Sequence, residues 1–458
     1  MSTSARNPLR ALPSVDALIN SVGGAALVER YGRSSTVEAL RAALAEARAR
    51  LRSEANGDLG AAYAPADLLD AAAARLHAAF APSLRPVINA SGIIIHTNLG
   101  RAPLSEAAQR ALIEVAAGYS TLEYDLAAGA RGSRLIHAEA ALKAITGAEA
   151  ALVVNNNAAA LVLLLSALAQ GREVILSRGQ LIEIGGGFRV PEIMAQSGAI
   201  LREVGTTNRT RAADYVNAIG PQTALIMRAH ASNFKLIGFV EETPLAELAA
   251  IAHRHDLLLV DDLGSGALLD TAEYGLDHEP TVGESLAAGA DLVAFSADKL
   301  LGGPQGGIVV GRAALIERLK RHPLARAVRA DKLCLAALSA TLDHYRRGEA
   351  TTHIPVWRMI AMPLPAIEEQ AEHWAQQLGA GSVIPGESAV GGGSLPGATL
   401  STRLLALTPD DPNSFAARLR AADPPVIARI VADQVVFDPR TVLPNQTGQL
   451  LSAVRSAL

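Results

Sequence analysis

The sequence has little or none of several features that define particular protein classes. Its single cysteine, Cys334, excludes an internal disulfide and a cluster of thiolate metal ligands. The longest apolar run, AAALVLLLSALA, is shorter than the roughly 18 residues of a membrane span, so no membrane segment is expected. The net charge is −4, so no overall basic field favours a nucleic-acid partner.

The amino terminus and the cysteine usage indicate a cytoplasmic protein. The segment MSTSARNPLRALPSVD lacks the apolar core of a signal peptide, and one cysteine in the whole chain fits a reducing compartment. Hydrophobic residues make up 50% of the 458 residues, which is enough for a sizeable core. Length predicts about three domains, or one large domain with appendages.

Lysine is also scarce, because arginine supplies nearly all of the positive charge. Five lysines are present, at Lys143, Lys235, Lys299, Lys320 and Lys332. Any reaction that needs a lysine amine therefore has only five candidate residues.

Residues 1–82 form an alanine- and arginine-rich module with helical periodicity, and Pro82 and Pro86 mark its end. Three helices are predicted, over 15–32, 36–51 and 65–80. Ten arginines against eight acidic residues through Arg85 make the module mildly basic. Modules of this kind usually serve packing or oligomerisation, so charge alone leaves RNA binding as the less usual alternative.

Between 83 and 330, apolar runs typical of strands alternate with helical segments. The strand candidates are AALVVN, EVILS, ILREVG, TALIMRAH, LLLVDD and DLVAFS. This alternation predicts an α/β domain with a mostly parallel sheet that helices cover on both faces. Too few residues separate Phe295 from Ile308 for the crossover that parallel strands need, so the strand Ile308–Val310 is expected to run antiparallel.

Residues 331–458 predict a smaller α+β domain. A long helix is expected over 331–348, followed by stretches rich in proline and glycine and by short strands such as those in PPVIARIVADQVVFDP. The expected organisation is therefore a helical amino-terminal module, a large α/β domain and a small carboxyl-terminal domain, over 1–82, 83–330 and 331–458.

Polar residues follow four of the predicted strands, at the edge where open α/β sheets bind ligands. They are Asn155–Asn157 before a helix that opens at Ala158, then His230, the pair Asp261 and Asp262, and Ser296 with Lys299. Each has an ordinary explanation, because asparagines cap helices, a histidine packs in a loop, and paired acids cap loops or bind Mg²⁺. None of them identifies a function by itself.

Taken together, these residues match the needs of pyridoxal phosphate. The cofactor needs a lysine amine for its aldehyde, a carboxylate at its pyridine nitrogen, a helix amino terminus for its phosphate and a flat group against its ring. The candidates are, in that order, Lys299; Asp262; Asn156, Asn157 and Ala158 with the Ser296 hydroxyl; and His230. Lys299 is chosen because it alone of the five lysines follows a buried strand, where desolvation lowers the pKa of an amine.

Eight distinctive stretches are spread along the chain. They are RPVINASGIIIHTNLGRAPL, TLEYDL, VVNNNAAA, SRGQLIEIGGGFRVP, EVGTTNRT, DLGSG, FSADKLLGGPQGGIVVG and RAVRADKL. Together they closely resemble the bacterial selenocysteine synthases, the L-seryl-tRNA(Sec) selenium transferase family. This resemblance implies a fold-type-I pyridoxal phosphate enzyme that uses Lys299. It also implies an amino-terminal domain that recognises the selenocysteine tRNA, and a homo-oligomer built as a ring of dimers, with a decamer expected. The Gly306–Gly307 pair and the SAD triplet are minor departures from the family pattern.

The resemblance also implies the reaction, which is a β-replacement on the seryl group of L-seryl-tRNA(Sec). The serine hydroxyl leaves, and selenophosphate supplies the selenium of L-selenocysteinyl-tRNA(Sec). Lys299 is expected to remove the Cα proton while Asp262 keeps the ring nitrogen protonated. Asp298 either relays a proton to the leaving hydroxyl or only caps a turn.

A small anionic selenium donor requires cations, and the resemblance implies three arginines at the active site. Arg326 and Arg329 are spaced i, i+3 at an expected helix start, so they are predicted to share one helix face. Arg101 follows HTNLG just before another helix. Considered singly, an arginine is more often part of a weak surface ion pair.

Two other functions compete with this interpretation. A fold-type-I enzyme could act on a small phosphorylated amino acid without tRNA, but such relatives of the family lack the helical module found here at 1–82. A non-catalytic α/β protein would have lost its cofactor, and the joint presence of Lys299, Asp262 and the asparagine run argues against that.

Overall fold

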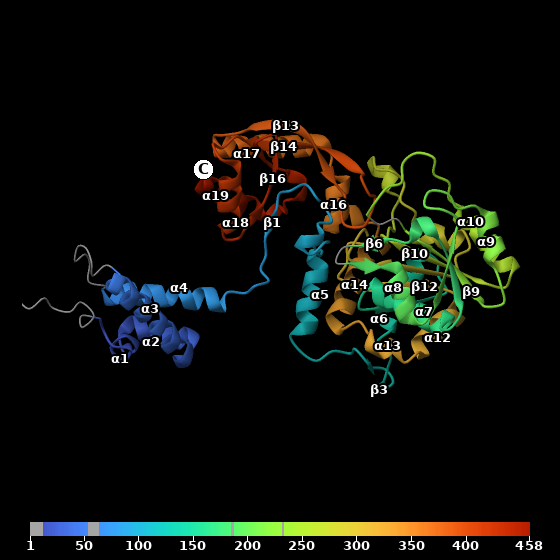
Figure 1. Ribbon diagram of the computed structural model, residues 1–458, viewed down its shortest axis with the longest axis horizontal. Coiled ribbons are helices and arrows are strands. Elements are labelled where there is room, and N and C mark those ends of the chain that lie inside the picture. Colours follow the sequence, from blue (N-terminus) through green and yellow to red (C-terminus); the bar gives the residue numbers. More distant parts are fainter. Residues whose placement is uncertain (1–11, 54–63, 185–186, 231–232) are drawn as a thin grey trace, which may run out of the picture. The chain divides into compact units, whose positions relative to one another are not determined.

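The computed structural model describes residues 12–53, 64–184, 187–230 and 233–458, and it divides the chain into two compact units, 1–86 and 87–458. Figure 1 shows the elements of each unit. The boundary lies four residues beyond the predicted end of the helical module. Division of the larger unit near residue 330 stays a prediction.

Over residues 12–53 and 64–86, the amino-terminal unit contains four helices where the sequence predicted three. They are α1 (Val15–Ile19), α2 (Val22–Tyr31), α3 (Arg33–Ser53) and α4 (Pro65–Phe80). The single helix expected over 15–32 was wrong because Ser21 begins a new helix, and its side chain accepts a hydrogen bond from Gly24 N. A Cβ at Gly24 would lie 2.0 Å from the Leu18 carbonyl oxygen, so only glycine permits this close turn. The helices share a core that includes Leu18, Leu40, Leu44, Leu68 and Leu76.

The larger unit is built around a seven-stranded sheet of order β4-β12-β11-β10-β9-β5-β8. The strands are β4 (Ala150–Val154), β5 (Glu173–Ser177), β8 (Ile200–Val204), β9 (Thr223–Ala229), β10 (Leu258–Gly264), β11 (Leu292–Ser296) and β12 (Gly307–Gly311). Every pairing is parallel except those of β12, which runs antiparallel to β11 and β4. The predicted strands and the antiparallel exception are confirmed.

Helices cover both faces of this sheet because alternate residues of each strand face opposite ways. Leu152 and Val154 of β4 belong to one core cluster, and Ala151 and Val153 belong to another. The helices of the large α/β part are α6 (Ile136–Thr146), α7 (Asn157–Ala169), α8 (Val190–Ser197), α9 (Ala212–Ala218), α10 (Leu245–Arg254), α11 (Val282–Ala287), α12 (Ala313–Arg321), α13 (Leu324–Ala327) and α14 (Lys332–Arg346). The long helix expected at 331–348 is confirmed as α14, and Asp331 caps it.

The carboxyl-terminal part adds a four-stranded antiparallel sheet of order β13-β14-β17-β16. Its elements are α15 (Ala350–His353), α16 (Pro355–Ala361), α17 (Leu364–Leu378), β13 (Ser382–Ala389), β14 (Thr399–Leu407), α18 (Pro412–Ala421), β15 (Val426–Ile427), β16 (Arg429–Val431), β17 (Gln434–Phe437) and α19 (Thr447–Ala457). Strand β1 (Ile88–Asn89) pairs with β15, which ties the start of the unit to its end.

The described part of the larger unit also contains one further α-helix and two short hairpins. Helix α5 (Glu106–Ala116) packs against α14, and the hairpins β2–β3 (Tyr124–Asp125, Ala130–Arg131) and β6–β7 (Glu183–Ile184, Phe188–Arg189) project from the loops. Within the described ranges, no helix has the length and apolar character that crossing a membrane would require.

Candidate active site

Lys299 lies in a tight turn that follows β11, at the edge where the parallel strands end. The residue is 6% exposed, and its Nζ donates a hydrogen bond to the Gly393 carbonyl over 3.3 Å. The Leu300 N–H donates to the Ser265 carbonyl at 3.0 Å, and the Gly302 N–H donates to the Lys299 carbonyl at 2.9 Å. These backbone bonds hold the lysine in one position.

The glycines around the lysine permit close backbone approach. Gly302 has φ +73°, and a Cβ there would lie 2.3 Å from Ile354 Cγ2. Gly266 of the DLGSG stretch has φ +69°, and a Cβ there would lie 2.5 Å from the Ser296 carbonyl oxygen. Both positions need glycine because other residues rarely adopt this conformation and the space is already filled.

A partly buried tyrosine, Tyr345, which the sequence did not single out, bonds the far side of the turn. The Tyr345 hydroxyl lies 2.8 Å from the Leu301 carbonyl, to which it donates, and it accepts a hydrogen bond from Trp357 Nε1 at 2.7 Å. Burial raises the pKa of this phenol, so it remains a hydrogen-bond donor. Helices α14 and α16 thereby support the lysine turn, through residues about 45 and 60 positions away in the chain.

Two adjacent aspartates at the end of β10 face different partners. Asp262 Oδ1 accepts a hydrogen bond of 2.9 Å from Asn157 Nδ2, at the start of α7. Asp261 forms a bidentate pair with Arg228, with both N–O distances at 2.7 Å. Because successive strand residues point to opposite faces, only Asp262 shares the side of the sheet that carries Asn157. This arrangement supports the choice of Asp262 as the partner of a ring nitrogen.

Burial shifts the pKa values of both principal ionisable groups toward their neutral forms. Desolvation lowers the pKa of Lys299, against the opposing pull of the Asp262 carboxylate. Desolvation also raises the pKa of Asp262, while the hydrogen bond from Asn157 and the charge of Lys299 act in the other direction. A neutral amine is the nucleophile that an aldehyde requires, and a protonated ring nitrogen beside Asp262 would favour its ionised form.

His230 lies beside Asp262, because its N–H donates to the Asp262 carbonyl at 3.0 Å. Its Nε2 is 3.1 Å from Oε1 of Glu279, whose side chain is 4% exposed. Both residues line a cavity of about 360 Å³, together with Gln180, Arg228, Lys235 and Leu395. Glu279 was missed because nothing in its local sequence distinguishes it from a surface glutamate.

The asparagine run after β4 has divided roles. The Asn156 side chain caps α7 by accepting a hydrogen bond from Ala159 N at 2.9 Å, and Asn157 turns toward Asp262. Gly307 of β12 packs against this start, since a Cβ there would lie 2.2 Å from the Asn156 carbonyl oxygen. Ser296, at the end of β11, is 6% exposed. The phosphate roles of Asn156, Asn157, Ala158 and Ser296 stay predictions.

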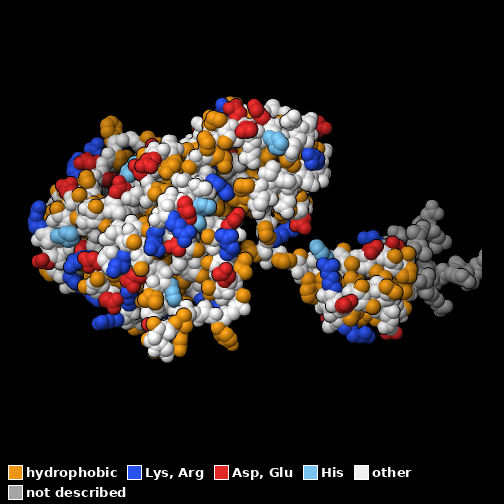
Figure 2. All heavy atoms as spheres, turned by 180° about the vertical axis from the view of Figure 1, so that it is seen from behind, with side chains coloured by type: hydrophobic (Ala, Val, Ile, Leu, Met, Phe, Trp, Pro, Cys, Tyr) orange, Lys and Arg blue, Asp and Glu red, His pale blue; other side chains and the backbone are white. Residues whose placement is uncertain are grey.

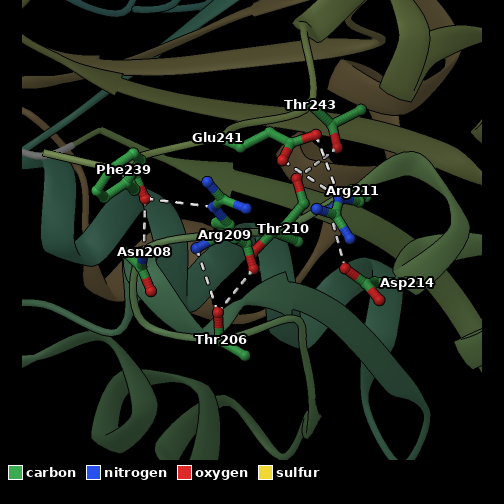
Figure 3. Close-up of polar contacts among 9 residues, drawn as sticks. All are labelled: Thr206, Asn208, Arg209, Thr210, Arg211, Asp214, Phe239, Glu241 and Thr243. Atoms are coloured by element: carbon green, nitrogen blue, oxygen red, sulfur yellow. Dashed lines mark hydrogen bonds and ion pairs between the residues drawn. The ribbon is translucent and has the colours of Figure 1, made fainter.

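The EVGTTNRT stretch forms a loop after β8 that organises a neighbouring segment (Figure 3). Asn208 donates a hydrogen bond to the Phe239 carbonyl at 2.6 Å, and Arg211 pairs with Glu241 at 3.2 Å. A Cβ at Gly179 would lie 2.7 Å from the Thr207 carbonyl oxygen, so the loop also packs closely against Gly179. Gly179 and Val240 line the His230 cavity, so the loop lies next to part of that lining.

Arg101 lies directly beside the lysine turn. Its Nη1 donates a hydrogen bond of 2.8 Å to Asp298, whose side chain is 8% exposed. The Ala102 N–H donates to the Asp298 carbonyl at 3.3 Å. The positive charge of Arg101 also helps to lower the pKa of Lys299, after the larger effect of burial.

The expectation that Arg326 and Arg329 share one helix face was wrong. Helix α13 ends at Ala327, so Arg326 is helical and Arg329 is not. The Val328 carbonyl accepts a hydrogen bond from Asn155 N at 2.9 Å, and Arg329 forms a β-bridge with Val154. Pairing with the end of β4 replaces the helix at this point.

Arg326 and Arg329 nevertheless line one cavity of about 470 Å³ beside β4. Its other charged lining residues are Glu123, Arg131, Arg134, Lys320 and Arg321. Arg101 is not in the described lining of this cavity, so within one chain the three predicted arginines occupy two separate places.

The residues at the strand ends fit pyridoxal phosphate by their chemistry. Lys299 offers a buried amine of lowered pKa, and Asp262 offers a buried carboxylate. Ser265 Oγ and Asn157 Oδ1 are buried polar atoms with no hydrogen-bond partner among the described residues, and a polar ligand would satisfy them. Over the same residues, no group of three or more His, Cys, Asp or Glu is arranged to hold a metal ion.

The sheet, its helices and this edge define a fold-type-I pyridoxal phosphate enzyme. The fold is similar to that in "Structure of D-Glucosaminate-6-phosphate Ammonia-lyase", with a TM-score of 0.58 and 18% identity over 82% of this chain and 96% of that one. Residues 87–443 match the L-seryl-tRNA selenium transferase family, and residues 9–48 match its selenocysteine synthase N-terminal region. The chain belongs to the L-seryl-tRNA selenium transferase family, whose members are pyridoxal phosphate-dependent transferases of selenocysteine biosynthesis.

Curated relatives match this chain over nearly its full length. The L-seryl-tRNA(Sec) selenium transferase of Hyphomonas neptunium is 48% identical over 98% of both chains. That of Solidesulfovibrio magneticus is 47% identical over 96% of both chains. The predicted family and cofactor class are confirmed.

Proposed function

We propose that this chain converts L-seryl-tRNA(Sec) to L-selenocysteinyl-tRNA(Sec) with Lys299 as its central catalytic residue. The observation that carries this assignment is a buried lysine in a hydrogen-bonded turn, at the sheet edge where Asn157 bonds Asp262, in a chain that matches the family over residues 87–443. When bound, pyridoxal phosphate withdraws electrons from the Cα of the seryl group. The Lys299 amine removes the Cα proton, and the carboxylate of Asp262 holds a proton at the ring nitrogen.

Asp298 and Arg101 act beside the lysine. The Asp298 carboxylate contacts the Arg101 guanidinium, so we assign it a role in orienting this cation as well as in proton delivery to the leaving hydroxyl. The serine oxygen leaves as water, and the selenium of selenophosphate then bonds to Cβ. Water cleaves the Se–P bond, and the phosphoryl group leaves as inorganic phosphate. Arg101 contributes positive charge where the anionic donor approaches.

We assign tRNA recognition to the amino-terminal unit. Helix α3 carries five exposed arginines, which are Arg33, Arg41, Arg48, Arg50 and Arg52. Phosphate contacts from arginines release counterions, so the binding is expected to weaken steeply with salt. The family match at 9–48 supports this assignment over the alternative of an enzyme for small phosphorylated amino acids.

A protein that begins at Leu84 is expected to retain bound cofactor and to lose tRNA(Sec) affinity. The physical reason is that residues 87–458 contain the whole cofactor edge within one compact unit. Filter binding at several salt concentrations measures the affinity, and the absorbance spectrum of the same protein reports the cofactor. The assignment fails if the shortened protein binds the tRNA as tightly as the full chain.

We assign binding of the anionic selenium donor to the cavity that Arg326 and Arg329 line, and we assign to Arg101, beside the lysine turn, the cation that the donor meets during transfer. Support comes from the cavity that Arg326 and Arg329 line, and from the planar guanidinium fork, which can bond two oxygens of one anion. Arg326 has no side-chain partner among the described residues, so its donors are available to a ligand.

Arg326→Ala is expected to slow selenium transfer by about 10- to 100-fold, as loss of one charge-assisted hydrogen bond costs about 1.5–3 kcal/mol. Affinity for tRNA(Sec) should not change, because the tRNA is bound elsewhere. Arg346→Ala is the matched control, since Arg346 is exposed and pairs only with its helix neighbour Asp343. Parallel measurements of tRNA affinity and selenium incorporation decide the point. A loss of tRNA affinity in step with activity would identify Arg326 as a tRNA contact.

We also propose that the chain works as a homo-oligomer, a ring of dimers with ten subunits. The segment from α5 to α6 exposes five large apolar side chains, which are Ile113, Tyr119, Tyr124, Leu126 and Ile136. Figure 2 shows apolar side chains projecting from the lower edge of the larger unit. Such a patch is typical of a surface that a second copy covers. Native mass spectrometry of the full chain gives the subunit number.

A further inference from the structure

The cavity beside β4 combines many cations with one carboxylate. Its lining contains the arginines Arg131, Arg134, Arg321, Arg326 and Arg329 and the lysine Lys320, whereas Glu123 is the only acidic residue in the described lining. Glu123 belongs to the TLEYDL stretch, and no step of the proposed reaction uses a residue of that stretch. Its position among the cations therefore needs an explanation.

Glu123 contacts three of the cavity arginines at once. Its Oε1 accepts hydrogen bonds from Arg134 Nε at 2.8 Å and is 2.7 Å from Arg134 Nη2. Its Oε2 accepts from Arg131 Nη2 at 3.0 Å, and Arg329 Nη1 lies 3.7 Å from Oε1. The hydrogen bond from Arg134 and the surrounding arginine charges lower the pKa of Glu123, so the carboxylate is ionised at neutral pH.

The guanidinium of Arg134 is already bonded to other groups of the protein. Besides bonding Glu123, its Nη1 donates to the Ala330 carbonyl at 3.1 Å, so the guanidinium joins the β2–β3 hairpin to the residue after Arg329. By contrast, the side chains of Arg321 and Arg326 have no hydrogen bond or ion pair to any described residue. The cavity thus contains two kinds of arginine. Those that contact Glu123 have their charge neutralised by its carboxylate, whereas Arg321 and Arg326 keep their charge for a ligand.

We propose that Glu123 is a specificity-determining residue, because its carboxylate competes with entering anions for the arginines of this cavity. Its negative charge opposes any anion that enters, so a ligand is retained only when it bonds Arg321, Arg326 and Arg329 together. This inference rests on the proposed function, in which the cavity receives the anionic selenium donor. A site with this arrangement discriminates against weakly bound cellular anions.

The sign of the effect follows from Coulomb's law. A carboxylate in the wall of a partly solvated cavity weakens the binding of an anion held in that cavity by roughly tenfold. Glu123→Gln removes the charge and keeps a carbonyl oxygen that can accept from Arg134. The variant is therefore expected to bind inorganic sulfate roughly tenfold more tightly, and the gain should shrink as ionic strength rises.

Calorimetric titration of the full-length protein with sodium sulfate at low ionic strength measures this effect. Glu317→Gln is the matched control, because Glu317 also pairs with a cavity cation, Lys320 at 3.1 Å, but is not part of the lining. The control should change sulfate affinity less than twofold. Glu123→Asp, which keeps the charge, should bind sulfate like the unmodified protein and covers the case in which Glu123→Gln does not fold.

Two different failures are distinguishable. Unchanged or weaker sulfate binding in Glu123→Gln, with binding still dependent on Arg326, would overturn the competitor role alone. Tighter binding by Glu123→Asp, despite its retained charge, would also overturn that role. Sulfate binding that survives Arg326→Ala would show that the cavity is not the anion site, and the proposed donor site would then fail as well.

Discussion

Lys299→Ala is expected to abolish turnover and to leave the fold intact. The lysine is the only amine at the carboxyl edge of the sheet that the structure describes as buried, and its side chain makes one hydrogen bond, to Gly393. Alanine removes the nucleophile without breaking the backbone bonds of the turn. Borohydride reduction of the loaded enzyme, followed by peptide mass mapping, should place the pyridoxyl group on Lys299.

Lys143→Ala is the matched control, because Lys143 is exposed on α6 and has no role at the cofactor edge. It should retain full activity. The pH dependence gives a second check, since burial lowers the pKa of Lys299. The neutral, reactive amine is therefore present at pH values at which an exposed lysine is still protonated, and labelling should persist there. A label on any other lysine would show that the site is wrongly placed.

Asp262→Asn is expected to cost about two to four orders of magnitude in activity, because removing one partner of a buried ionic contact costs about 3–5 kcal/mol. The neutral amide cannot keep a ring nitrogen protonated, although its oxygen can still accept the hydrogen bond from Asn157. Single-turnover kinetics and the absorbance spectrum of the cofactor measure the loss.

Asp261→Asn separates this catalytic effect from general damage. Asp261 is completely buried and pairs with Arg228, so its loss should lower the free energy of unfolding and affect turnover much less. Chemical denaturation of the two variants gives the comparison. Equal losses of activity, or a greater loss in Asp261→Asn, would mean that the other face of β10 carries the cofactor.

Local patterns were sufficient to predict the sheet. The inner parallel strands consist mostly of short apolar runs between turn residues, because both of their faces are buried. The edge strand β8 is the exception, since most of its residues are exposed. The antiparallel direction of β12 followed from chain length alone, since too few residues connect it to β11. Lys299 was identifiable because only five lysines are present and one of them follows such a run.

Local patterns failed where a long-range contact overrode them. The i, i+3 spacing of Arg326 and Arg329 is typical of a helix face, but Val328 pairs with Asn155 and ends the helix. The split of the first predicted helix had a local signal, the serine cap at Ser21, which the apolar periodicity concealed. Apolar periodicity indicates which face of a helix is buried. It does not indicate where competing hydrogen bonds end the helix.

The sequence by itself determined the alternating architecture, the lysine, the aspartate pair and the family, because these depend on short-range order and on distinctive local stretches. Only the tertiary structure decided which aspartate faces Asn157, how Tyr345 and Trp357 support the lysine turn, and why Glu123 and Glu279 differ from surface glutamates. Most of these contacts join residues that are far apart in the chain, and Glu123 bonds Arg131 and Arg134 across the β2–β3 hairpin. All of the residues are of common types. Their pairing is set when helices and strands pack, and no local pattern encodes it.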